Sequence, residues 1–150
     1  MKFGDVVTAV ASLAVIVTLL DAVLLGVFVP LMGGGGTDVA GILSTLVASL
    51  IVGYVFALKI QEESRMGTIA SIVVLFAVVS MLATLAFIAN PLASPAVQEN
   101  INKMLSTSGW TNYDWFNAVF MVLALNVVVA LVFSFIGLYA GSMLRKPKKS

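Results

Sequence analysis

The sequence predicts an all-α integral membrane protein, an antiparallel four-transmembrane-helix bundle with a short amphipathic external helix between the third and fourth helices. Two observations of composition support this fold class. Of the 150 residues, 61% are hydrophobic and only 10% are charged, whereas soluble domains have about 45–50% apolar and about 25% charged residues. A third observation is that four apolar stretches each reach the roughly 20 residues that a helix needs to cross a bilayer.

The four predicted spans cover residues 6–32, 39–58, 66–89 and 116–144, and the chain forms a single membrane domain. The first span is much longer than the apolar region of about 7–15 residues in a secretory signal peptide, so we expect it to be retained. Short connections follow the first and second spans, which makes those neighbours antiparallel. Between the first two spans, the glycine run 33–36 predicts a flexible external turn.

The longest connection, residues 90–115, follows the third span. Ser94 and Pro95 are typical of a helix start, and apolar residues then recur at helical spacing opposite a polar side. This pattern predicts a short amphipathic helix. The sequence leaves open whether that helix lies flat on the membrane surface or folds back over the bundle.

Three aromatic residues precede the fourth span, and amphipathic rings of this kind favour the headgroup layer. We therefore expect them to anchor the start of the fourth helix at the interface. A patch that binds a partner or a ligand is the alternative interpretation. The residues are Trp110, Tyr113 and Trp115.

The cations separate the two sides of the membrane. Seven of the eight lysines and arginines lie at the chain ends or between the second and third spans, and only Lys103 lies in the external connection. By the positive-inside rule, both termini are cytoplasmic. Arg145 and Lys146 begin a basic tail, residues 145–150, which we expect to contact anionic lipid. A chain without cysteines or Asn-x-Ser/Thr acceptor sites suits a prokaryotic plasma membrane.

The composition also restricts the chemistry. Without cysteine or histidine, the chain cannot form disulfides, Cys/His zinc sites or histidine-ligated haem. We expect no cofactor, no metal and no catalytic residue. A net charge of +1 provides no basic field for nucleic acid, so no nucleic-acid partner is expected.

Small residues predict where the helices pack, because close approach of backbones is a main source of helix association in lipid. The second predicted span has such residues at unbroken four-residue spacing, and the fourth has a similar stripe that ends in a GxxxG pair. The residues selected on the second span are Gly41, Thr45, Gly53 and Ala57, and those on the fourth are Ala130, Ser134, Gly137 and Gly141.

Asp21 is the one charged residue well inside a predicted span, where an acid costs about 2.5–3.5 kcal/mol to insert. Counting residues from the outer end of each predicted span puts Ser49, Ser80 and Asn126 at the same depth, so we expect one intramembrane polar layer in which Asp21 contacts Asn126. Two interpretations remain open. The layer binds a proton or small cation, or its hydrogen bonds only fix the helix register.

The sequence therefore favours a small non-catalytic membrane protein that acts by helix packing. Its expected partners are the lipid bilayer and either other membrane subunits, as an accessory or assembly component, or further copies of itself. The alternative is a small proton- or cation-coupled transporter or channel that uses Asp21.

Overall fold

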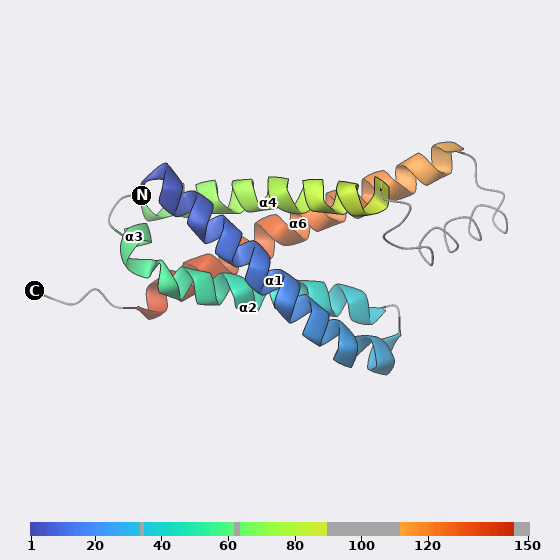
Figure 1. Ribbon diagram of the computed structural model, residues 1–150, viewed down its shortest axis with the longest axis horizontal. Helices are drawn as coiled ribbons and strands as arrows, with labels where there is room; N and C mark the ends of the chain where they lie inside the picture. The colour runs from blue at the N-terminus through green and yellow to red at the C-terminus, as the bar shows by residue number, and fades with distance from the viewer. Residues whose placement is uncertain (34, 62–63, 90–111, 146–150) are drawn as a thin grey trace, which may run out of the picture.

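The computed structural model describes residues 1–33, 35–61, 64–89 and 112–145. Its long helices are α1 (Phe3–Met32), α2 (Gly35–Val55), α4 (Arg65–Ala89) and α6 (Asn112–Leu144), and α3 (Ala57–Gln61) is a single short helix (Figure 1). The described residues contain no strand. The four long helices are long and apolar enough to cross a membrane, which confirms this part of the predicted fold class. The predicted external helix, Trp110 and Lys146 lie outside the described residues.

The helices begin earlier than the apolar pattern predicted. Helix α2 starts at Gly35 rather than at residue 39, and α6 starts at Asn112 rather than at residue 116. Hydropathy marks where apolar residues begin, whereas helical hydrogen bonding continues into the polar residues that flank a span. Each early start shifts the depth of every residue counted from it.

Gly33, Gly35 and Gly36 are the described members of the glycine run, and they lie where α1 ends and α2 begins. Gly33 has φ 63°, which glycine adopts without steric cost, and its N–H donates to Val29 O at 2.9 Å. Gly36 is buried so closely against the Phe28 carbonyl that an added Cβ would overlap it. These glycines therefore connect α1 and α2 by close backbone packing.

The span predicted as residues 39–58 breaks at Phe56, which separates α2 from α3. Backbone hydrogen bonds continue through the break, from Phe56 N–H to Val52 O at 2.9 Å and from Ile60 N–H to Phe56 O at 3.0 Å. Ala57 and Ile60 are buried, and α3 packs against both α4 and α6. The short helix thus covers one end of the protein.

Successive long helices run in opposite directions, and each contacts two others (Figure 1). Helix α2 packs on α1 and α6, while α4 packs on α6 and α1. Helix α1 crosses α2 and α4 on one face, and α6 crosses them on the other. As a result, α1 and α6 belong to opposite faces of the protein.

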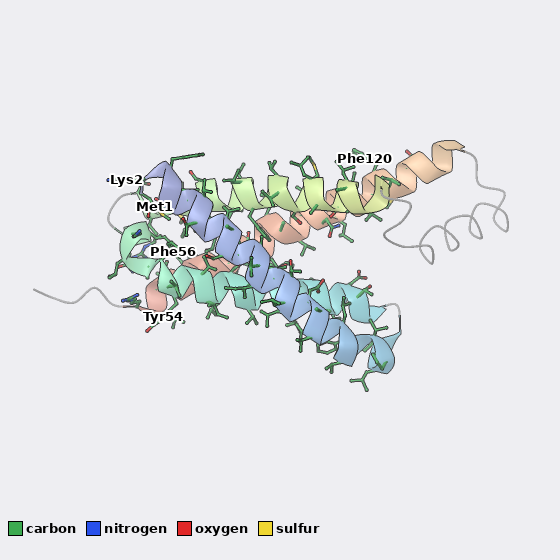
Figure 2. The ribbon with its side chains drawn as sticks, viewed as in Figure 1. Met1, Lys2, Tyr54, Phe56 and Phe120 are labelled. Atoms are coloured by element: carbon green, nitrogen blue, oxygen red, sulfur yellow. The ribbon has the colours of Figure 1, made fainter. Side chains whose placement is uncertain are left out.

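We call the end where α1 starts, α3 lies and α6 finishes the α3 end, and the opposite end the far end (Figure 1). Most of the core lies toward the α3 end, since it comes from the first half of α1, the first half of α4 and the second half of α6. Figure 2 shows Met1, Lys2, Tyr54 and Phe56 grouped at this end. The core residues include Ala9, Val10, Leu13, Val52, Ile60, Ile69, Ile72, Val73, Phe76, Ala77, Ala130 and Leu138.

The far halves of α1 and α6 bury few side chains. The buried residues of α1, which are Ala9, Val10 and Leu13, all lie in its first half. Over the apolar stretch of each helix as a whole, 6% of the residues are buried in α1 and 11% in α6, against 39% in α2. Leu19 on α1 is 64% exposed and Phe120 on α6 is 63% exposed. Helix α2 is therefore the central helix, and α1 and α6 leave apolar surface for lipid or for other proteins.

Candidate intramembrane polar site

Asp21 lies half-buried on α1, where α1 contacts α2. Its nearest polar partner is Ser44 of α2, whose Oγ lies 3.3 Å from Asp21 Oδ1 and 3.1 Å from Gly41 O. Both distances exceed the usual 2.5–3.0 Å for O–H···O bonds. A hydroxyl has one hydrogen, so Ser44 can donate to only one of these oxygens at a time.

The two oxygens within reach of the Ser44 hydroxyl belong to different helices. Asp21 Oδ1 lies on α1, and Gly41 O lies on α2. A hydrogen bond to Asp21 therefore joins the two helices, whereas a hydrogen bond to Gly41 stays within α2.

Asn126 lies on α6 and belongs to a different helix pair. Its Nδ2 is 3.4 Å from Thr84 Oγ1 on α4, and the Thr84 hydroxyl donates to Ser80 O at 3.0 Å. The expected contact between Asp21 and Asn126 is therefore replaced by two separate ones, Asp21 with Ser44 and Asn126 with Thr84. The reason is topological, because α1 and α6 cross on opposite faces of the protein.

The other two members of the predicted layer are also separated. The Ser49 hydroxyl donates to Thr45 O at 2.6 Å, and its side chain lies against α6 near Gly137. Ser80 is half-buried on α4 and provides the carbonyl that accepts from Thr84. The structure thus divides the four residues between the α1–α2 contact, the α2–α6 contact and the α4–α6 contact.

A signal for Ser44 is present in the sequence. In an antiparallel hairpin, residues equally far from the turn lie at the same depth. Asp21 precedes Gly33 by 12 residues and Ser44 follows it by 11. Counting from the predicted helix start at residue 39 selected Ser49 instead, because α2 starts four residues earlier, at Gly35.

Most hydroxyl groups in the spans donate back to their own helix. Each bonds to the carbonyl three or four residues before it, as serine and threonine often do in helices. These hydroxyls are used locally and do not form a continuous polar path between helices. The bonds are those of Thr8, Thr18, Thr45, Ser49, Ser71, Thr84, Ser134 and Ser142.

The small residues selected on α2 and α6 largely lie where these helices meet. An added Cβ would lie 2.5 Å from Leu138 O at Gly53 and 2.6 Å from Ser49 Cβ at Gly137, and at Gly141 it would overlap Leu50 O. Because these neighbours are mostly backbone atoms, they cannot move aside as a side chain can. The two backbones approach so closely only because these positions are glycines.

The rest of the predicted packing set is not uniform. Thr45, Ala57, Ala130 and Ser134 are buried. Gly41 is only half-buried, and an added Cβ there would meet nothing within 4 Å. Gly41 therefore differs from Gly53, Gly137 and Gly141, since no neighbouring helix approaches it closely.

Polar contacts at the α3 end connect α3 to its neighbours. Lys59 forms a salt bridge with Asp5 at the start of α1. Gln61 Nε2 donates to Ser142 O at 2.6 Å and to Arg145 O at 3.2 Å, at the end of α6. The sequence pattern does not mark Asp5, Lys59 or Gln61 as contact residues, because their contacts depend on where α3 lies after the break at Phe56.

Arg145, which we expected to act as an interface anchor, contacts the end of α2. Its guanidinium group lies 5.8 Å from the centre of the Tyr54 ring, and its Nη1 donates to Val55 O at 3.4 Å. Tyr113 and Trp115 fall within α6. Arg145, the first residue of the basic tail, therefore contacts protein.

Among the described residues, no three acidic side chains come together in a way that could hold a metal ion. No protein-family model matches the chain, and comparisons with curated proteins and with solved structures found no significant match.

Proposed function

We propose that this chain is a small non-catalytic membrane protein that acts through helix packing, as an accessory or assembly subunit of a larger membrane complex or as a homo-oligomer. One observation carries the proposal. Most of the described hydroxyl groups in the spans bond to carbonyls of their own helices, so they leave few polar groups to line a path for an ion.

The proposed setting is a prokaryotic plasma membrane, with both termini in the cytoplasm. The described cations support this orientation, because Lys2, Lys59, Arg65 and Arg145 belong to the α3 end. A cytoplasmic α3 end follows the positive-inside rule. The exposed apolar halves of α1 and α6 then lie toward the opposite side, and they are the surfaces that the proposal assigns to partner helices.

A small proton- or cation-coupled transporter or channel is the second candidate function. It is favoured by one observation, the half-buried Asp21 whose contact with Ser44 is long. A weakly bonded carboxyl inside a span is a common feature of proton and ion pathways.

Native mass spectrometry of the protein, extracted gently from its own membrane, separates the two candidates. The proposal expects foreign subunits in a fixed ratio or a defined homo-oligomer. A monomer that catalyses proton or cation flux in liposomes would contradict it.

The Asp21→Asn variant sharpens this test, since an asparagine keeps hydrogen-bonding capacity but cannot exchange a proton. Under the packing proposal, Asp21→Asn assembles as the unchanged protein does. If the variant assembles normally but loses a flux that the unchanged protein shows, the transporter is the correct assignment. Thr18→Val, which removes a hydroxyl bonded to its own helix, is the matched control.

A further inference from the structure

Two adjoining pockets, both open at the protein surface, lie at the α3 end between the start of α1 and the first half of α4. The smaller has a volume of about 290 Å³ and is lined by Ser64, Gly67, Thr68 and Ser71, with Met1 and Val6 on the other side. The larger, about 690 Å³, shares Met1, Val6 and Ser71 with it and continues along α4 past Ala70, Val74 and Val78. They form one space with a polar mouth and an apolar groove.

The groove extends into the span. Ala70, Val74 and Val78 are four residues apart, so they form one row on α4 about 12 Å long at 1.5 Å per residue. Phe3 and Val6 of α1 line the same groove. This row lies in the part of α4 that is apolar enough to cross the membrane, and the polar mouth lies where α4 begins.

Thr68 is the unusual residue of the mouth. Its side chain is buried, with the residue only 7% exposed. Its N–H donates to Ser64 O at 2.9 Å, but within the described residues no hydrogen bond of its hydroxyl is found. In this part of the chain no fully enclosed side-chain oxygen or nitrogen lacks a partner. The Thr68 hydroxyl therefore opens into the cavity that it lines.

The start of α4 favours an anionic group at the mouth. The positive end of the α4 dipole lies here, and phosphate groups are stabilised at such helix starts. Charged residues of both signs adjoin the lining in the sequence, so side-chain charge does not select the ligand: Lys2 is next to Met1, Asp5 is next to Val6, and Ser64 lies between Glu63 and Arg65. A buried hydroxyl and a helix start thus meet at the polar end of an apolar groove.

We propose that this space binds one membrane phospholipid, with its phosphodiester in the mouth at Thr68 and one acyl chain in the groove along Ala70, Val74 and Val78. The polar mouth at the start of a span, followed by an apolar groove within the span, corresponds to the order of polar and apolar parts in a lipid. The inference does not depend on the proposed function, because a lipid can occupy this space whether or not the protein has partner subunits.

Native mass spectrometry of the delipidated full-length chain in maltoside micelles tests the proposal. The probes are dioleoyl phosphatidylglycerol, dioleoylglycerol, which has the same chains without phosphate, and glycerophosphoglycerol, which has the headgroup without chains. We expect a single phosphatidylglycerol to bind at least about tenfold more tightly than either other probe, since a hydrogen bond to a charged group has roughly that effect. Equal binding of dioleoylglycerol would overturn the proposal.

Two variants locate the lipid, each with a matched control. Thr68→Val keeps the side-chain shape and removes the hydroxyl, so we expect it to weaken phosphatidylglycerol binding about tenfold, with Thr18→Val as the control. Ala70→Leu fills the groove, so we expect a similar loss, with Ala83→Leu as the control on exposed α4 surface. Unchanged binding in either lining variant would overturn the proposal. If a variant does not fold, the three probes on the unchanged chain still decide the outcome.

Discussion

The α3 end and the far end contain the same four long helices but keep them together in different ways. At the α3 end, Gly141 and Gly53 bring α6 against α2 without intervening side chains, and Lys59 and Gln61 connect α3 to α1 and α6. Toward the far end, long hydrogen bonds from Ser44 and Asn126 join the helices in pairs. The comparison shows that the helices pack most closely at glycines, and not at the polar side chains inside the spans.

The largest expected effect comes from the closest backbone contact. Gly141→Ala places a Cβ on Leu50 O, and the helices must separate to accept it. We expect the free energy of unfolding in detergent micelles to fall by about 2–3 kcal/mol, as in overpacked cores.

Gly26→Ala is the matched control for Gly141→Ala, because a Cβ there meets nothing within 4 Å. It should leave stability unchanged or raise it by up to about 1 kcal/mol through helix propensity. If both variants lose the same free energy of unfolding, Gly141 acts through the conformation of its own helix and not through its contact with α2. The two ends of the protein would then not differ in packing.

The second effect tests whether α3 fastens α6. Gln61→Met keeps the length of the side chain but removes both donors to Ser142 O and Arg145 O. We expect a loss of about 1–2 kcal/mol for two net hydrogen bonds, measured by unfolding in the same micelles. Leu58→Met, at an exposed α3 position, should change stability little. If Gln61→Met lowers the free energy of unfolding no more than Leu58→Met does, α3 covers the end of the protein without fastening α6.

The far end should give a smaller effect, which a double-mutant cycle measures. Asp21→Leu and Ser44→Ala should show a coupling of about 0.6 kcal/mol, the average for hydrogen bonds between membrane helices. Asp21→Leu and Asn126→Leu should show no coupling, since these residues contact different helices. Strong coupling between Asp21 and Asn126 would mean that the two residues contact each other after all, as the sequence predicted.

The smallest effect is expected at the salt bridge between Asp5 and Lys59. Asp5 is accessible to water, and the Lys59 side chain is half exposed, so salt screens the pair. Asp5→Asn should lower the melting temperature slightly in low salt and not at all in high salt. Lys59→Met should have the same effect, and the double variant should lose no more than either. A loss that persists in high salt would indicate a packing role for Asp5.

The sequence was sufficient to predict four helices of membrane-spanning length, because the length of an apolar run is set by the thickness of the bilayer that it crosses. It was also sufficient to select Gly53, Gly137 and Gly141, which are small for a packing reason. It could not separate them from Gly41, which belongs to the same four-residue stripe. The difference depends on the angle at which α6 crosses α2, and a stripe on one helix contains no information about that angle.

The polar site was harder to predict for a related reason. Depth inside a membrane is counted from a helix end, and apolar residues do not mark where α2 begins. The count from residue 39 selected Ser49 on this helix, whereas α2 begins at Gly35 and Ser44 is the residue that lies beside Asp21. The break at Phe56 had no Pro or Gly to mark it, so the positions of Lys59 and Gln61 could not be assigned.

The closest helix contact, between α2 and α6, joins the second and the fourth long helices of the chain. During synthesis from the N-terminus, α2 enters the membrane well before α6 has been made. The surface of α2 at Gly53 therefore lacks its α6 partner until the end of the chain is complete. Helices in a bilayer form first and associate afterwards, so the α1–α2 hairpin can assemble early while the closest interface forms last. Chains released before α6 is complete would therefore expose the Gly53 surface, and a membrane chaperone or protease could distinguish unfinished copies by it.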